Sequence, residues 1–226
     1  MLNTHSLGAT VNAVNEAFLF GERIPKSEAS RISTFIASRQ GLPGNYGGLF
    51  APAEGELVSS YRLFTGDSVV MTASAARHIL GEESLRILKV LDICTPAVQG
   101  AIQRAQDKFG EGLAEARRNG YGIGTFCCGK CTVAYWRALT TGWIADAEER
   151  IRAGMVDLAA SRQNGKWRRY PFYYTVHCLC DLPRELANAE RKYIQPSCER
   201  ALKGLKPNAE YYQQKSAILE NLLEVT

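Results

Sequence analysis

The sequence predicts an all-α protein built from stacked helical hairpins, on the strength of three observations. The phrase LAEARRNG at 113–120 returns as LAASRQNG at 158–165, and IASRQG at 36–41 is a fainter copy. Apolar residues recur with the 3.6-residue period of a helix, whereas the two-residue alternation of a strand seldom extends beyond four positions. Self-similarity at a spacing of 20 to 50 residues is typical of stacked supersecondary units.

A threonine opens an apolar stretch after each copy of the phrase, at Thr72, Thr132 and Thr175. Aligning the copies on these threonines makes three sets of positions equivalent: Ala75, Tyr135 and Cys178; Ala76, Trp136 and Leu179; Ile79, Leu139 and Leu182. Their spacing places them on one face of a helix. We therefore expect this face to be buried in every unit.

The expected helices cover 9–20, 27–40, 67–80, 83–92, 96–118, 129–141, 145–162, 171–182, 184–203 and 208–224. Residues suited to cap helix N-termini are Ser27, Asp67 and Thr95, the last followed by Pro96. Glycines suited to stop a helix are Gly81, Gly120, Gly142 and Gly165.

These helices group into one domain over 1–226, with repeat units at about 27–80, 96–141 and 145–182. The first unit carries an insertion at 41–60 whose glycines and prolines favour a loop, and a long loop of this kind is a candidate lid. The amphipathic helices within 184–224 are expected to cap the stack or to dimerise.

Composition excludes several classes of protein. The net charge of +4 is small and the basic residues are scattered, so no nucleic-acid binding is expected. No stretch of 18 apolar residues suggests a transmembrane helix. The first residues do not resemble a secretory signal, and the odd number of cysteines, seven, favours reduced thiols, so we expect a cytoplasmic location.

Two stretches carry a family resemblance. PFYYTVHCLCDL at 171–182, preceded by RQNGKW, and GKCTVAYW at 129–136 resemble the repeats of protein prenyltransferase β subunits and of squalene and hopene cyclases. The resemblance covers roughly 30–182 and implies an α/α toroid, in which inner helices surround an apolar cavity. Because only three units are convincing, it implies a partial or small ring, or a ring completed by a second copy in a homodimer.

The chemistry of that family transfers poorly. Its prenyltransferases hold zinc through positions that correspond here to Gly129, Cys131 and Tyr174. Of these, only Cys131 is of the residue type that the family uses there, and zinc needs three or four ligands. The basic cluster for a diphosphate and the Asp-rich motif of the cyclases are not recognisable either. An ordinary member of either enzyme class is therefore not expected.

A different Cys/His site is an alternative. Cys127, Cys128 and Cys131 lie at the start of one expected inner helix and His177 lies on the next, and thiolates with imidazole suit zinc. We take Cys131 and His177 as candidate catalytic residues, and Cys128, Cys131 and His177 as candidate zinc ligands. No cofactor is otherwise predicted. The competing interpretation is that these cysteines are core residues, as cysteines often are.

Aromatic and basic residues near these positions suggest a binding surface. The candidates for contact with a hydrophobic, isoprenoid-like ligand are Tyr135, Trp136, Trp167, Phe172 and Tyr174, and those for contact with an anionic group are Arg168 and Arg169. Helical spacing favours core packing for the aromatic residues over ligand contact, and a solvated rim is the default interpretation of the arginines.

Two functions remain open from the sequence. The first, which the loss of the family's catalytic motifs favours, is a non-catalytic binder of a hydrophobic small molecule or a protein partner on its concave surface. The alternative is an enzyme that acts on a prenyl or other apolar substrate through a metal-assisted Cys/His site. The binder predicts an apolar cavity without converging titratable groups, and the enzyme predicts such groups in one cleft.

Overall fold

The computed structural model describes residues 1–68 and 71–226 and confirms the all-α fold. Its helices are α1 Leu7–Leu19, α2 Lys26–Ser38, α3 Ala73–Leu91, α4 Pro96–Arg118, α5 Gly129–Leu139, α6 Ala147–Ala160, α7 Phe172–Asp181, α8 Arg184–Gly204 and α9 Tyr212–Val225. A short 3₁₀ helix covers Val58–Ser60, and two strands, β1 Arg162–Gln163 and β2 Lys166–Trp167, form an antiparallel hairpin. Within the described ranges, no helix is both long and apolar enough to cross a membrane.

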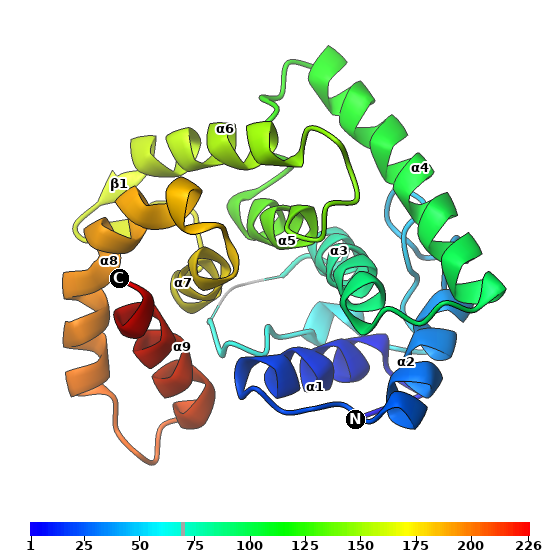
Figure 1. Cartoon of the computed structure of the whole chain (residues 1–226), viewed down its shortest axis with the longest axis horizontal. Coiled ribbons are helices and arrows are strands. Elements are labelled where there is room, and N and C mark those ends of the chain that lie inside the picture. The colour runs from blue at the N-terminus through cyan, green and yellow to red at the C-terminus, as the bar shows by residue number, and fades with distance from the viewer. Residues whose placement is uncertain (69–70) are drawn as a thin grey trace.

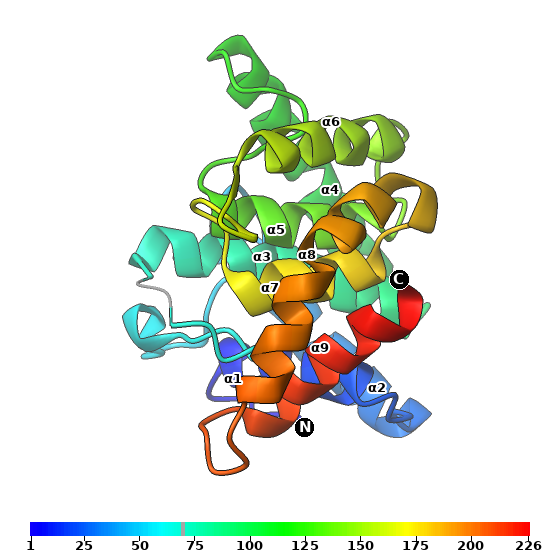
Figure 2. The ribbon, with the colours of Figure 1, turned by 90° about the vertical axis from the view of Figure 1, so that its left-hand side faces the viewer.

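The helices form an inner and an outer set. In Figure 1, α3, α5 and α7 are seen nearly end-on in the middle, while α2, α4, α6 and α8 lie around them. Figure 2 shows the same three inner helices lengthwise. Contacts join α1 to α3, α3 to α5, α5 to α7, α7 to α9 and α9 back to α1. The expected capping helix α9 therefore belongs to the inner set and completes a cycle of contacts within one chain.

The equivalent apolar positions of the three units are buried as expected. All nine residues that the repeat aligns are less than one-tenth exposed, from Ala75 on α3 to Leu182 after α7. Leu219 and Leu222 lie on α9, in the segment expected to cap the stack or to dimerise, and both are also fully buried inside the chain. The repeat thus locates the inner faces correctly.

Helix α3 is continuous where the sequence suggested two helices. It begins after Thr72, whose hydroxyl accepts a hydrogen bond from the Ala75 N–H, and runs through Gly81 without a break. A Cβ at Gly81 would lie 2.7 Å from the Leu49 Cβ, so this glycine serves the close approach of a loop rather than a helix end. Residues 69–70 of the expected helix 67–80 lie outside the described residues.

Two other helix boundaries differ from those expected from the sequence. Helix α2 begins at Lys26 with Pro25 as its N-cap, so Ser27 lies inside it, whereas Thr95 caps α4 as predicted. Gly165 does not follow a helix directly. It forms, with Asn164, the turn of the β1–β2 hairpin, where both residues have positive φ angles, 50° and 70°. Asn-Gly is the preferred pair for such a two-residue turn. The sequence analysis took Gly165 as a helix stop and did not predict the hairpin.

The insertion of the first unit is largely packed rather than free. Its Leu49, Phe50 and Ala51 are fully buried. Its Glu56 accepts 2.8 Å hydrogen bonds from the N–H groups that begin α1. Just beyond the insertion, Asp67, expected to cap a helix of its own, instead accepts hydrogen bonds from the first-turn N–H groups of α7. Such carboxylates satisfy donors that a helix start leaves unpaired, so this region holds two inner helices in place.

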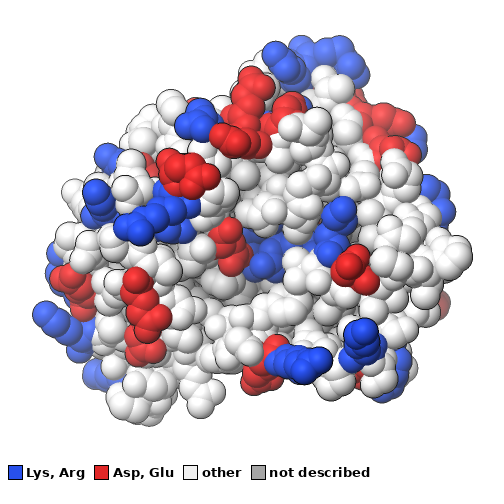
Figure 3. Space-filling view, viewed as in Figure 1, with Lys and Arg blue, Asp and Glu red and all other residues white. Residues whose placement is uncertain are grey.

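A buried network of charged and polar groups joins four inner helices. Arg137 on α5 is fully buried, and its Nε lies 3.1 Å from Asp181 on α7 and 3.4 Å from Glu83 on α3. Its Nη2 donates to Asn15 on α1, which also accepts from Arg86. Figure 3 shows charged groups of both signs in a hollow at the middle of one face. The meeting point of the inner helices is therefore partly ionic, unlike the wholly apolar interior that the toroid resemblance implies.

Removing the Arg137 charge should destabilise the fold strongly. In Arg137→Met, Glu83 keeps its buried carboxylate without its ion-pair partner, and uncompensated buried charges of this kind typically cost about 3–5 kcal/mol. Chemical denaturation measures the free energy of unfolding. Arg152→Met is the control, because the Arg152–Glu148 pair is exposed and should change stability by less than about 1 kcal/mol. Equal, small effects of the two substitutions would contradict the importance of the network.

Candidate metal centre

The packing of α3 against α5 brings two separated sequence segments together. His78 and Glu82 lie one turn apart on α3 and are both fully buried. Cys131 lies in the first turn of α5 and is also buried, while Cys127 lies just before that helix and is exposed. Helix α3, the first turn of α5 and the residue before its N-cap therefore supply an imidazole, a carboxylate and two thiols to one place.

Three of these residues form a group with the geometry of a metal site. One ligand atom each from His78, Cys127 and Cys131 can be chosen so that all lie within 4.8 Å of one another. Cys127 has a φ angle of 67°, a left-handed backbone conformation that is unusual for a side chain of this type. Two thiolates and one imidazole form a ligand set that suits zinc.

Glu82 lies beside the imidazole of His78. Its Oε1 is 3.2 Å from His78 Nε2, yet neither imidazole nitrogen and neither oxygen of Glu82 makes a well-aligned hydrogen bond within the described residues. Buried polar groups are normally satisfied, and an exception requires an explanation such as an ion. A carboxylate next to a histidine is also a common means of orienting a metal-bound imidazole.

The local electrostatics favour a cation. Burial lowers the pKa of His78, but the neighbouring Glu82 carboxylate and Cys127 thiol outweigh it and raise the pKa to about 9. Burial raises the pKa of Glu82 to about 7. The neighbouring imidazole of His78 lowers the pKa of Cys127. Without a metal, the imidazolium thus supplies the positive charge that this group of acids requires.

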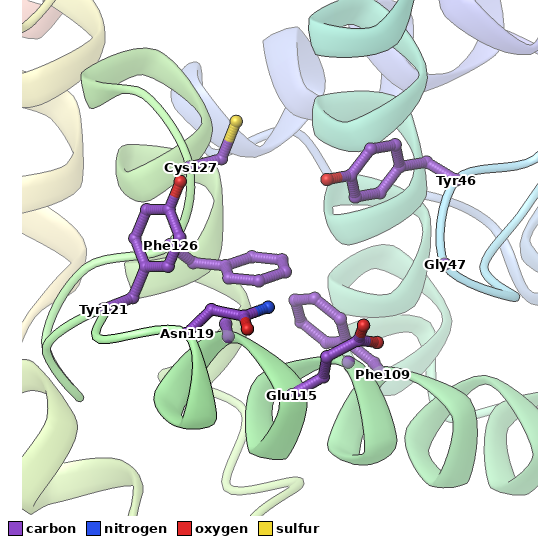
Figure 4. Close-up of a pocket in the computed structure, with 10 residues that line it drawn as sticks. Tyr46, Gly47, Phe109, Glu115, Asn119, Tyr121, Phe126 and Cys127 are labelled. Atoms are coloured by element: carbon purple, nitrogen blue, oxygen red, sulfur yellow. The ribbon is translucent and has the colours of Figure 1, made fainter.

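An aromatic cavity opens beside the group. Its volume is about 320 Å³, and Tyr46, Phe109, Phe126, Tyr121 and Cys127 line it together with residues of α4. Tyr46, from the 41–60 loop, stacks on His78 with ring centroids 4.3 Å apart. In Figure 4, Tyr46 and Cys127 lie on opposite sides of the opening, the rings of Phe109 and Phe126 approach each other, and Glu115 and Asn119 project from α4.

A second pocket is also lined by Cys127. Its volume is about 490 Å³, and its lining includes Cys127, Cys128, Lys130, Arg169 and Tyr170. Cys128 is the N-cap residue of α5, and its Sγ lies 3.5 Å from that of Cys131. The hydrogen bond with Cys131, aided by backbone N–H groups of the first turn, lowers the pKa of Cys128 to about 5.

The structure places Cys131 with His78 and Cys127 rather than with His177. His177 packs edge-on against Phe64 and lies 4.0 Å from Asp181, in the central network. Burial lowers the pKa of His177 to about 3, so the imidazole is neutral there. In the part of the chain that the structure describes, no group of three metal-ligand atoms includes His177. The candidate metal group therefore includes Cys131, as expected, but its imidazole comes from His78 on α3 instead of His177 on α7.

The aromatic residues expected to bind a ligand are mostly core residues. Tyr135, Trp136 and Tyr174 are fully buried and Trp167 nearly so. Their polar ends have partners inside the protein, for example Gly124 O for Trp136 and Glu190 for Trp167. Phe172 is partly buried, and Arg168 is exposed. Of the residues expected to contact a ligand, Arg169 lines a pocket that Cys127 also lines.

Sequence reasoning missed His78, Glu82 and Tyr46. The spacing of four between His78 and Glu82 is that of one helix face, but treating Gly81 as a helix stop assigned the two residues to different helices. Tyr46 lies in a glycine-rich loop without periodicity, so no local pattern connects it with His78. The sequence therefore contained a pattern that could have linked His78 with Glu82, but none that could have linked Tyr46 with His78.

Comparison of the chain with protein-family models, with curated proteins and with solved structures gives no match. The resemblance to prenyltransferase and cyclase repeats consequently stays an expectation from the sequence.

Zinc binding should depend on His78 and Cys127 but not on His177. We expect the purified protein to bind about one equivalent of zinc, and His78→Ala or Cys127→Ala to weaken it at least about tenfold. Glu82→Gln should weaken binding about 10–100-fold, because it removes the charge that orients the imidazole. Competition with a chromogenic chelator measures each affinity, and circular dichroism checks folding. The opposite order, with His177→Ala losing zinc and His78→Ala keeping it, would contradict this ligand set.

Proposed function

We propose that this protein is a zinc-dependent enzyme that acts on an apolar substrate at the group formed by His78, Cys127 and Cys131. The observation that carries the proposal is the position of this group at the edge of an aromatic cavity that Cys127 itself lines. Catalytic zinc sites typically have three protein ligands and keep the fourth position for water or substrate.

The surroundings support an open site more than a closed structural one. Structural zinc sites usually have four protein ligands. Cys128 is a neighbouring thiol, but it does not belong to the group of mutually close ligand atoms, although its Sγ lies 3.5 Å from that of Cys131. The fourth position is thereby left to a molecule that enters from a pocket.

The residues around the cavity have complementary roles in this proposal. A bound zinc ion would polarise an oxygen of the substrate or of a water molecule. Glu82, 3.2 Å from the imidazole of His78, would hold it in one orientation. Phe109 and Phe126 would exclude water and contact the apolar part of the substrate, and Glu115 and Asn119 are placed to orient a polar part (Figure 4).

This proposal takes up the second of the two functions left open by the sequence. A non-catalytic binder would need the apolar cavity alone, and the convergence of two thiols, an imidazole and a carboxylate beside it favours an enzyme. The volume of about 320 Å³ suits a small apolar group. A prenyl group remains the substrate class that the family resemblance suggests.

Cobalt substitution tests the open position directly. The cobalt(II) protein should show thiolate and ligand-field absorption bands, and octanohydroxamate, a metal-binding head on an apolar chain, should shift them. Acetohydroxamate, with the same head and no chain, should bind at least about tenfold more weakly, because each buried methylene contributes about 0.8 kcal/mol. Titration followed by visible absorption gives both affinities. Bands that neither compound shifts would indicate a closed structural site and contradict the enzyme proposal.

Two glycines of α4 provide a matched pair of variants for the cavity. Gly112 lines the cavity and Gly110 does not, and a Cβ at either position meets no other atom within 4 Å. Gly112→Leu should therefore fill the cavity without disturbing the helix and should weaken octanohydroxamate at least about tenfold, the value of a few buried methylenes. Gly110→Leu should leave both affinities unchanged. If the two variants changed the affinity for octanohydroxamate equally, the apolar chain of the ligand would not lie in this cavity.

A further inference from the structure

Cys128 and Cys131 have the arrangement of an exchange-competent dithiol. They occupy the N-cap and the first turn of α5, and their Sγ atoms lie 3.5 Å apart. A disulfide requires a separation of about 2.05 Å, which modest side-chain rotation reaches when two cysteines are already this close. Both cysteines are free thiols.

The two thiols differ in access. Cys128 is exposed and lines the pocket of about 490 Å³ together with Lys130, Arg169 and Tyr170. Cys131 is fully buried behind it. A disulfide that enters this pocket can meet the sulfur of Cys128 but not that of Cys131. This difference gives the two residues distinct roles, because attack and resolution need one accessible and one adjacent sulfur.

We propose that Cys128 and Cys131 exchange electrons with small disulfides, so that the chain cycles between a dithiol and an internal disulfide. The thiolate of Cys128 attacks one sulfur of a disulfide RSSR, forming a mixed disulfide and releasing RS⁻. Cys131 gives its proton to the released thiolate and attacks the Cys128 sulfur, and the second RS⁻ leaves and takes up the proton that Cys128 had lost. In total the two cysteines are oxidised by two electrons, and RSSR is reduced to two RSH.

The dithiol and the metal group share Cys131. A thiolate binds zinc, whereas a sulfur in a disulfide has lost the charge that makes it a good ligand. Oxidation therefore removes one of the three zinc ligands, and bound zinc holds back the resolving thiol. The exchange activity rests on the proposed function only in this competition. The exchange itself needs no metal.

Oxidised glutathione is a suitable probe. The metal-free full chain should lose two hydrogen atoms in mass and retain no glutathione. Because Lys130 lies between the two cysteines, tryptic digestion places them on separate peptides, which the new disulfide should join. Fragmentation then distinguishes Cys128 from Cys127. A disulfide that maps to Cys127, or a native chain that only retains glutathione, would overturn the proposal.

Single variants separate the steps. Cys128→Ser should slow disulfide formation at least about tenfold, and Cys131→Ser should stop at one glutathione on Cys128. Cys94→Ser, which removes an exposed thiol elsewhere, should react like the native chain. Cys128 is exposed, so its substitution should not disturb folding, and Cys131→Ala serves as a second variant for the buried position. If Cys128→Ser forms the same disulfide at the native rate, the proposal is wrong.

Cys127→Ser distinguishes this proposal from the metal site. It removes a zinc ligand but neither sulfur of the dithiol, so it should lose zinc and still form the internal disulfide at the native rate. Disulfide formation in a protein that binds no zinc would leave the exchange activity standing and the proposed function refuted. The reverse result, zinc binding without any Cys128–Cys131 disulfide, would refute the exchange alone.

Discussion

The buried guanidinium of Arg137 is the constraint on which the rest of the structure depends. It contacts carboxylates of α3 and α7 and the amide of Asn15 on α1, so four inner helices meet on one network. A buried charge tolerates little displacement from its partners, because separation in a medium of low dielectric constant is costly. The network therefore fixes how far α5 slides along α3, which packing of apolar side chains alone would leave less strictly defined.

The same pair of helices carries the candidate metal centre. Glu83 and Glu82 are neighbours on α3 and serve different purposes, the first in the central network and the second beside His78. Once α3 and α5 are aligned, His78 lies beside Cys127 and Cys131. The packed insertion of the first unit adds Tyr46 over the imidazole, so the segment that interrupts the repeat contributes to the wall of the cavity.

Sequence reasoning succeeded where a residue's role depends on its helix face. The repeat located the buried stripe, and the Thr-Pro pair located the start of α4 at Thr95. It failed where long-range contact overrides local preference. Gly81 continues a helix because Leu49 packs against it, and Asp67 caps a helix about one hundred residues away. The pairing of Cys131 with His78 follows from helix register, which no pattern in a single sequence specifies.

X-ray absorption spectroscopy of the zinc-loaded protein tests the central claim most directly, because it counts the atoms bound to the metal. The structure predicts two sulfur ligands at about 2.3 Å, from Cys127 and Cys131, with one imidazole nitrogen at about 2.0 Å and one further light atom from water or a bound molecule. A first shell with three or four sulfur atoms, or one without imidazole, would contradict the account.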